Sequence, residues 1–314
     1  MHRFRKNRTN SDLFAWGRNN IGQLGLGDTA NRSSPVQVGA LTTWTSIVGG
    51  YNQTLVLKSD GTLWSWGNNG AGRLGLGDTL NRSSPVQVGS LTTWTLIGGG
   101  KIHHIAVNSD GTLWSWGANA TYGQLGLGDV ANRSSPVQVG SLTTWTAVAS
   151  SGIFRHNLAI KSDGTLWSWG RDVAGELGLG DVAHRSSPVQ VGSLTTWTSI
   201  AGASDASFAL KSDGTLWVWG RNTEGQLGLG DVAHRSSPVQ VGTLTTWTAI
   251  ATDVHSSLAL KSDGTLWAWG KNTEGQLGLG DVVLRSSPVQ VGALTTWTAL
   301  QRTGGYFVLA LQRG

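Results

Sequence analysis

One segment of the sequence recurs at a nearly fixed interval along the whole chain. Residues 60–67, Asp-Gly-Thr-Leu-Trp-Ser-Trp-Gly, return with few changes, and each copy is followed by one proline. The later copies span residues 110–117, 163–170, 213–220 and 263–270, and a diverged copy spans residues 12–17. A repeat of about 50 residues predicts a repetitive architecture, either an open array or a closed propeller.

The composition supports a folded protein and excludes some kinds of site. The 46 glycines hold fixed places in each repeat beside leucine, valine, isoleucine and tryptophan, which supply apolar surface for a core, so they do not indicate disorder. The absence of cysteine excludes disulfides and thiolate metal sites, and it leaves the redox compartment open.

Most of the net charge of +5 comes from the N-terminal end. Residues 1–9 hold Arg3, Arg5, Lys6 and Arg8 and no acidic side chain, which leaves 19 basic against 18 acidic groups elsewhere. We expect residues 1–11 to form a basic arm, either a solvated tail or a contact to phosphate or a partner. Because the remaining chain is nearly neutral, we do not expect nucleic acid as a partner, except through the basic residues of the arm.

We expect no membrane insertion. No stretch of about 18 residues is apolar throughout, and the basic residues 1–8 are not followed by the apolar core of a secretory signal. These absences leave the localisation open between the cytoplasm and an assembled particle.

Each repeat contains four strand-like runs. In one repeat these runs are residues 44–48, 53–57, 62–66 and 83–88. Asp-Gly between the second and third runs predicts a tight hairpin turn, since both residues tolerate positive φ. The proline in the fourth run cannot donate a ladder hydrogen bond, which predicts an edge strand.

The second and third runs are apolar at successive positions, as in residues 258–260 and 266–269. Strands that are buried on both faces fit a sheet packed between two similar sheets. Three tryptophans per repeat would give eighteen, and the observed 17 follow because Phe14 replaces one. We expect most of these rings to form the core between neighbouring sheets.

The two ends of the chain complement each other. The chain begins with a third and a fourth run, residues 13–16 and 33–38, and ends with a first and a second run, residues 297–300 and 306–311. We therefore predict an all-β, six-bladed β-propeller of four-stranded antiparallel blades, closed by pairing of residues 13–16 with 306–311. This propeller forms a single domain over residues 12–314.

Residues 269–281, Trp-Gly-x-Asn-x-x-Gly-Gln-Leu-Gly-Leu-Gly-Asp, resemble the repeat of the regulator of chromosome condensation family. The resemblance covers residues 12–311 in six copies, whereas the family fold is usually a propeller of seven blades. It implies a platform whose loops hold another protein. The family includes a nucleotide exchange factor, ubiquitin-ligase modules, an ultraviolet photoreceptor and a β-lactamase inhibitor. The photoreceptor's Gly-Trp-Arg-His-Thr motif is absent here.

The polar motifs indicate structural roles in turns rather than ligand binding or catalysis. The loop at residues 72–78 resembles a phosphate-binding loop, but no helical pattern follows it and it recurs in every repeat. Equivalent aspartates in different blades cannot converge, so turn hydrogen bonding accounts for them better. The seven histidines are scattered. We therefore expect no metal site, no cofactor and no catalytic residues. We also expect that the protein is not an enzyme.

Variation between the repeats gathers in the loop after the first run, while most other positions are nearly identical. A rigid frame with divergent loops is typical of a binding platform, although relaxed drift of exposed loops would give the same pattern. We predict partner binding through residues of these loops: Tyr51, Asn52, Lys101, His103, Phe154, Arg155, His156, Asp205, Asp253, His255, Arg302 and Tyr306.

The main hypothesis is a non-enzymatic scaffold that binds a protein of unknown identity through one propeller face. Two alternatives remain open. The near-uniform repeats and the basic arm would also suit a structural or assembly protein, for example of a virus particle or surface layer, and oligomeric assembly goes with that hypothesis. A propeller that binds glycans in one aromatic pocket per blade is the third hypothesis, and it requires exposed aromatic side chains in each repeat.

Overall fold

The computed structural model describes residues 11–40, 43–151, 155–301 and 309–312. The chain divides into two compact units, residues 1–150 and 151–314. Among the described residues, no helix combines the length and the apolar character needed to cross a membrane. The single domain over residues 12–314 stays a prediction.

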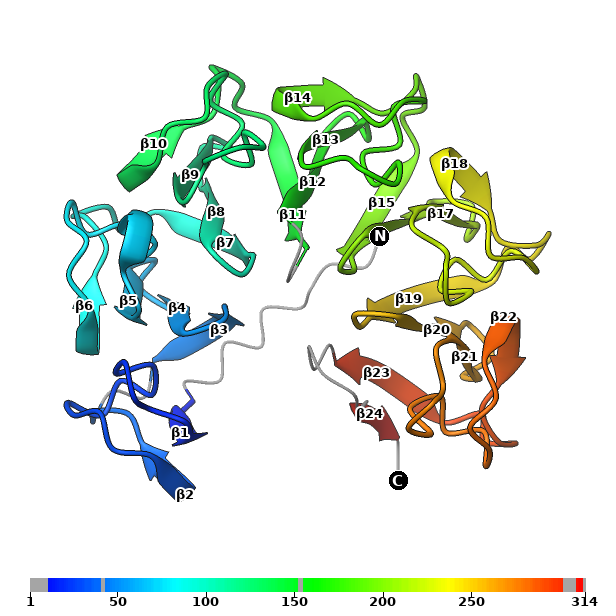
Figure 1. Cartoon of the computed structure of the whole chain (residues 1–314), viewed down its shortest axis with the longest axis horizontal. Helices are drawn as coiled ribbons and strands as arrows, with labels where there is room; N and C mark the ends of the chain where they lie inside the picture. The colour runs from blue at the N-terminus through cyan, green and yellow to red at the C-terminus, as the bar shows by residue number, and fades with distance from the viewer. Residues whose placement is uncertain (1–10, 41–42, 152–154, 302–308, 313–314) are drawn as a thin grey trace. The chain divides into compact units, whose positions relative to one another are not determined.

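The described strands of the first unit form antiparallel sheets in chain order (Figure 1). One two-stranded sheet, β1-β2, precedes two four-stranded sheets, β3-β4-β5-β6 and β7-β8-β9-β10. The strand bounds are β1 Phe14–Gly17, β2 Arg32–Gln37, β3 Trp44–Gly49, β4 Gln53–Lys58, β5 Leu63–Gly67, β6 Arg82–Gln87, β7 Trp94–Gly99, β8 His103–Asn108, β9 Leu113–Gly117, β10 Arg133–Gln138 and β11 Trp145–Ser150.

The second unit repeats the arrangement. Its four-stranded sheets are β15-β16-β17-β18 and β19-β20-β21-β22, and β23-β24 forms a two-stranded sheet. Strands β12, β13 and β14 pair in the same antiparallel order. The bounds are β12 His156–Lys161, β13 Leu166–Gly170, β14 Arg185–Gln190, β15 Trp197–Gly202, β16 Ala206–Lys211, β17 Leu216–Gly220, β18 Arg235–Gln240, β19 Trp247–Thr252, β20 Ser256–Lys261, β21 Leu266–Gly270, β22 Arg285–Gln290, β23 Trp297–Gln301 and β24 Leu309–Gln312.

The predicted all-β class and four-strand repeat are confirmed. The four predicted runs become β3 to β6 with ends that shift by about one residue, and β6 is the edge strand that Pro85 predicted. Of the predicted pairing of residues 13–16 with 306–311, residues 306–308 lie outside the described part of the chain, and the described strands β1 and β24 belong to two separate two-stranded sheets. Closure of the ring by that pairing stays a prediction.

The core lies between consecutive sheets, as the apolar runs predicted. In the second unit one buried cluster joins Phe208 and Val218 to Trp247, Ala259 and Trp269, which come from two neighbouring sheets. Strands β8 and β12 are buried at every position. Because both faces of these strands are buried, a polar side chain on either face needs a hydrogen-bond partner in the core.

The buried tryptophan of the third strand also joins each repeat to the one before it. In the second unit, the indole Nε1 atoms of Trp219 and Trp269 donate to the carbonyls of Glu176 and Gln226, each at 2.9 Å. In the first unit, Trp66 and Trp116 donate to the carbonyls of Gln23 and Arg73 at 3.0 and 3.1 Å. All four acceptors lie in the glycine-rich loop that follows the third strand of the preceding repeat.

The same loop lies directly on the next sheet through its glycines. Gly230 N donates to Ser286 O at 2.8 Å. Gly228 has a φ of +70°, and a Cβ atom there would lie 2.8 Å from Nε1 of Trp269. These contacts give the Gly-Gln-Leu-Gly-Leu-Gly-Asp motif a structural role, and no helix follows it in the described repeats.

We predict that Gly228→Ala destabilises the protein much more than Gly242→Ala. Both glycines have positive φ, which costs about 1–2 kcal/mol for alanine, but a Cβ at Gly242 meets nothing within 4 Å. The clash with Trp269 should add about 1–3 kcal/mol to the cost of Gly228→Ala. Urea unfolding of the two variants measures the difference, and equal midpoints would show that the loop does not pack as described.

Candidate partner-binding face

The variable loops join the first and second strands of each repeat. In the first unit they comprise residues 50–52 and 100–102, and in the second unit residues 203–205 and 253–255. Because neighbouring sheets within a unit pack face to face in the same orientation, these loops lie at the same end of their sheets. We refer to the loops of each unit, with the side chains that contact them, as its loop face.

The structure places the predicted binding residues in different environments. Tyr51 is 64% exposed, and Asn52, Lys101, Arg155 and His255 are half-buried. Asp205 and Asp253 are buried, and His103 and His156 are fully buried. Three further predicted residues lie outside the described part of the chain: Phe154, Arg302 and Tyr306.

The expectation that His103 and His156 lie in the loop is wrong. Each is the first residue of an inner strand, β8 or β12, and pairs with the glycine that ends the third strand. Nε2 of His156 lies 2.9 Å from Oγ of Ser207, which itself donates to the carbonyl of Glu176. The Ser207 oxygen therefore accepts from the His156 ring. This histidine has a structural role.

His104, the neighbour of His103, is buried with it. Burial, with the nearby His103 and Arg73 acting in the same direction, lowers the pKa of His104 to about 3. The ring is therefore neutral at physiological pH. No group of three or more histidine, aspartate or glutamate side chains within the described ranges could hold a metal ion.

In the first unit an aromatic side chain and a cation meet across two repeats. Nζ of Lys101 lies 4.4 Å from the centre of the Tyr51 ring. The carbonyl of Lys101 also accepts from Nε2 of Gln53 at 2.8 Å, so the loops of adjacent repeats are tied together. The result is an exposed cation–π pair, a contact worth about 0.5–1 kcal/mol at the surface.

In the second unit an ionic network crosses the loop face. Nη1 of Arg171 lies 2.5 Å from Oδ1 of Asp205 and 3.1 Å from Oε1 of Glu176. Nη1 of Arg221 lies 3.2 Å from the other oxygen of Asp205. Asp205 is 3% exposed, whereas the Arg221 side chain is 40% exposed. The buried carboxylate therefore orients two cations, of which one is open to a partner.

The residue after each Trp-Gly pair supplies these cations, and the sequence analysis missed it. Arg171, Arg221 and Lys271 occupy that position in three successive repeats, and their backbone N–H groups donate to the carbonyls of Arg155, Asp205 and His255. The sequence does contain a signal for this position: the residue after Trp-Gly varies between repeats although its neighbours are nearly identical. In the first unit it is Arg18, Asn68 or Ala118.

His255 lies beside these cations and is half-buried. Burial lowers the pKa of His255, with Lys271 and Arg221 acting in the same direction, while Glu224 and Asp205 oppose the change. The imidazole is therefore neutral at pH 7 and can both donate and accept a hydrogen bond. The positive charge of this face comes from arginine and lysine.

The fourth repeat carries an unusual buried carboxyl group next to the network. Five repeats have an asparagine at this position, and its Nδ2 donates to the backbone carbonyl of an aspartate at 2.9–3.0 Å. The fourth repeat has Asp172, which is fully buried. Burial and the nearby Glu176 carboxylate raise the pKa of Asp172 to about 7. Ionised Asp172 lacks the donor that asparagine supplies.

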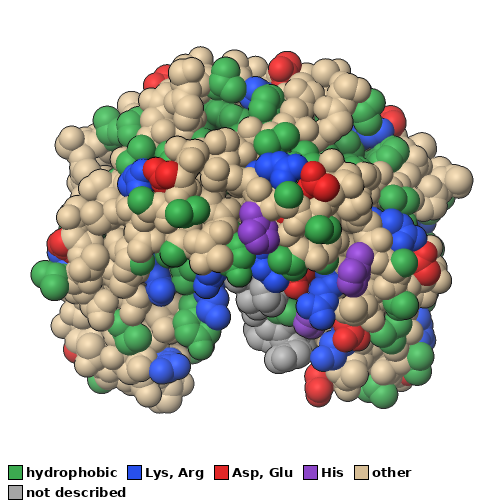
Figure 2. All heavy atoms as spheres, turned by 45° about the horizontal axis from the view of Figure 1, so that its top comes forward, with side chains coloured by type: hydrophobic (Ala, Val, Ile, Leu, Met, Phe, Trp, Pro, Cys, Tyr) green, Lys and Arg blue, Asp and Glu red, His purple; other side chains and the backbone are tan. Residues whose placement is uncertain are grey.

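The repeated aspartates form turn hydrogen bonds, as predicted. Oδ1 of Asp181 accepts from the backbone N–H of Ala183, and its other oxygen pairs with Arg185 at 2.6 Å. These contacts hold the pKa of Asp181 below its ordinary value. The same pair of an aspartate with an arginine four residues later recurs in the other repeats, and acidic and basic side chains lie next to each other at several places in Figure 2. The sequence analysis did not predict these pairs.

The fold and its loop face define a repeat protein of the β-propeller class. A crystal structure of yeast RCC1 (Prp20) bound to Kap60 has a TM-score of 0.79 and 22% identity, and covers 91% of this chain and 72% of that one. A second structure, that of Prp20p from Saccharomyces cerevisiae, was described together with its binding properties to Gsp1p and histones. It has a TM-score of 0.60 and 21% identity, and covers 90% of this chain and 86% of that one.

The chain belongs to the family of the regulator of chromosome condensation (RCC1) repeat. The family model matches residues 10–57, 60–107, 110–156, 163–210, 213–260 and 263–311. The ultraviolet-B receptor UVR8 of Arabidopsis thaliana is 31% identical over 57% of this chain and 42% of that protein. The human protein named "Probable E3 ubiquitin-protein ligase HERC3" is 39% identical over 24% of this chain and 7% of that protein. The chain thus spans less than half the length of either relative.

We predict that Asp172→Asn stabilises the protein most at high pH. A carboxyl group whose folded pKa lies above its unfolded value of about 3.9 binds more protons in the folded state, so its contribution to stability falls as pH rises from about 4 to 7. Asparagine does not ionise and restores the amide donor, so the free energy of unfolding should rise by about 1–3 kcal/mol at pH 8. Urea unfolding at pH 4.5 and pH 8 measures the effect.

The control for this prediction is Asn222→Asp, which puts the same carboxyl group at the equivalent position of the next repeat. It should destabilise the protein at pH 8 more than at pH 4.5. A difference between Asp172→Asn and the native protein that does not change with pH would contradict the raised pKa of Asp172.

Proposed function

We propose that this chain is a non-enzymatic scaffold that binds another protein through its loop faces. The observation that carries the proposal is the combination of a uniform, tightly joined frame with loops that differ in every repeat. The exposed Tyr51, the half-exposed Arg221 and the neighbouring Lys101 and Lys271 are residue types that anchor interfaces or steer charged partners.

The relatives support a protein as the partner. Prp20 forms a complex with Kap60, and its second structure was described together with its binding to Gsp1p and histones. By analogy of fold, a protein is the class of ligand that we propose for this chain. The loop face of the second unit offers a partner charges of both signs, because Arg221 and Lys271 are half-buried beside the half-buried Glu224, while Asp205 and Asp253 are buried.

We predict that a photo-crosslinking amino acid at position 51 or 221 captures one defined protein from an extract of the source cells. The same substitution at Val282, which is 63% exposed on the glycine-rich loop, is the matched control and should not capture that protein. Mass spectrometry of the crosslinked band identifies the partner. Capture at position 282 alone, or of a second copy of this chain at all three positions, would contradict the proposal, and the latter would favour an assembly protein.

The captured protein then allows a quantitative test. The variant Tyr51→Ala/Lys101→Ala/Arg221→Ala/Lys271→Ala should weaken its binding at least about tenfold, since two or more anchors are lost. Its urea unfolding should remain a single cooperative transition with a lower midpoint, because the cation–π contact and one of the two partners of the buried Asp205 are lost while the core is unchanged. Unchanged affinity would show that the loop faces do not bind the partner.

A further inference from the structure

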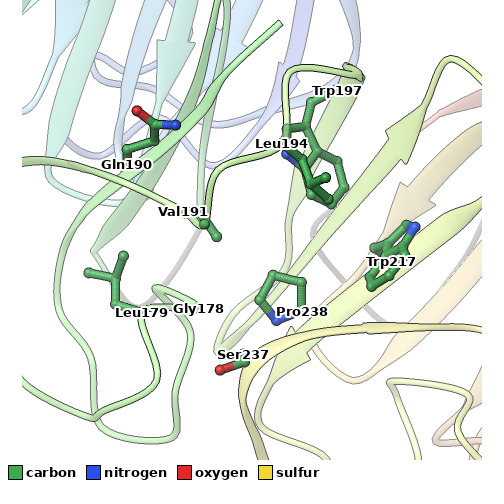
Figure 3. Close-up of a pocket in the computed structure, with 10 residues that line it drawn as sticks. Gly178, Leu179, Gln190, Val191, Leu194, Trp197, Trp217, Ser237 and Pro238 are labelled. Carbon is green, nitrogen blue, oxygen red and sulfur yellow. The ribbon is translucent and has the colours of Figure 1, made fainter.

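A pocket of about 330 Å³ lies in the second unit, away from the loop face. Trp197 is the first residue of β15, and the variable loop follows the last residue of that strand, so the pocket lies at the opposite end of the sheet. Figure 3 shows its lining residues: Gly178, Leu179, Gln190, Val191, Gly192, Leu194, Trp197, Trp217, Ser237 and Pro238.

Two tryptophans form the aromatic part of the pocket; Trp197 is only 3% exposed, so the half-buried Trp217 offers most of the ring surface. The rings of Trp197 and Trp217 meet edge to face, with centroids 6.1 Å apart and an angle of 84°. Nε1 of Trp217 donates to Oγ1 of Thr215 at 2.9 Å, and Nζ of Lys211 lies 3.8 Å from the ring centre. These contacts fix the orientation of the indole before a ligand binds, which lowers the entropic cost of binding.

Two polar side chains in the lining have unused hydrogen-bonding capacity. Within the described part of the chain, neither the amide of Gln190 nor the hydroxyl of Ser237 takes part in a side-chain hydrogen bond. The lining contains no charged residue. A ligand that matches this surface is neutral, has an apolar face for the indole, and carries hydroxyl groups for the amide and the serine. A pyranose ring has these three properties.

The lining is repeated along the sequence without change. All ten residues are identical at the equivalent positions of four other repeats, for example Gln87, Leu91, Trp94, Trp114 and Pro136. The perpendicular tryptophan pair recurs as well, with centroid distances of 6.3, 5.9 and 6.1 Å in three of these repeats.

Core packing does not explain all of this identity. The leucine of the lining is exposed in every described repeat, by 41–46%. The residue just before it varies between alanine, serine and threonine, so the exposed surface here does change between repeats. The leucine therefore keeps an apolar side chain at the rim of the pocket in each of these repeats.

We propose that this pocket, together with the equivalent residues of the other repeats, binds the pyranose rings of a neutral oligosaccharide. Each pocket holds one ring on its tryptophan wall, with hydrogen bonds from Gln190 and Ser237 in the second unit. Several weak pockets in one chain bind a long or branched glycan more tightly than one pocket alone, because the later contacts are intramolecular. This site shares no residue with the loop faces, so either proposal stands if the other fails.

We predict that the full chain binds at least one of cellohexaose, chitohexaose and mannohexaose, measured by calorimetry and by tryptophan fluorescence. The variant Gln37→Ala/Gln87→Ala/Gln190→Ala/Gln240→Ala removes four equivalent amides and should weaken that binding about tenfold, as expected for a lost ligand hydrogen bond. The matched control Val130→Ala/Val182→Ala/Val232→Ala/Val282→Ala changes four exposed side chains outside the pocket and should bind as the native chain does.

Three results would overturn the proposal. The first is no binding of any of the three sugars at millimolar concentration to the native chain, and the second is equal binding by the glutamine variant and the valine control. The third is that the native chain binds a decaproline peptide but none of the sugars, and that the glutamine variant does not bind the peptide. The pocket would then be a peptide-binding site. Urea unfolding of both variants confirms that each is folded during the titration.

Discussion

The structure depends on one interaction between neighbouring repeats, the hydrogen bond from a buried indole N–H to a carbonyl of the preceding repeat. A buried tryptophan needs an acceptor for that N–H, and a loop of the repeat before it provides one. The loop can approach the ring closely only because it has glycine there, as a Cβ at Gly178 would lie 2.8 Å from Nε1 of Trp219. The tryptophan and the glycine motif are therefore two halves of one contact, which explains why they recur together.

This contact separates the residues that hold the frame from the residues that can recognise a partner. The first strand, its tryptophan and the glycine loop are fixed by their neighbours, whereas the loop between the first and second strands contributes Ala203 to one buried cluster and leaves Tyr51 exposed in another repeat. Repeat proteins gain stability mainly from such nearest-neighbour interfaces. Changes at exposed loop positions such as Tyr51, which is 64% exposed, therefore alter the surface at small cost to folding, as a binding platform requires.

The sequence predicted the strands and the edge proline well because both follow from short-range rules, namely hairpin chemistry at Asp-Gly and the missing N–H of Pro85. It predicted the loop face less well. His103 and His156 were taken for loop residues because the loops differ in length between repeats, and only the pairing with Gly117 and Gly170 shows where the strands begin. The cation after Trp-Gly escaped notice since its importance comes from a contact with Asp205, which is distant in sequence.

Because the repeats are nearly identical, the positions at which the fourth repeat differs from the others are informative. Compared with its neighbours, it replaces asparagine by Asp172 and glutamine by Glu176, and both acidic groups are buried beside Arg171. A buried carboxyl group costs more to desolvate than the amide it replaces, so these changes do not improve folding. The two acidic residues nevertheless lie next to the ionic network that joins Arg171, Asp205 and Arg221. Violations of a local structural rule are expected where function requires them, and this one lies where the second unit presents its cations.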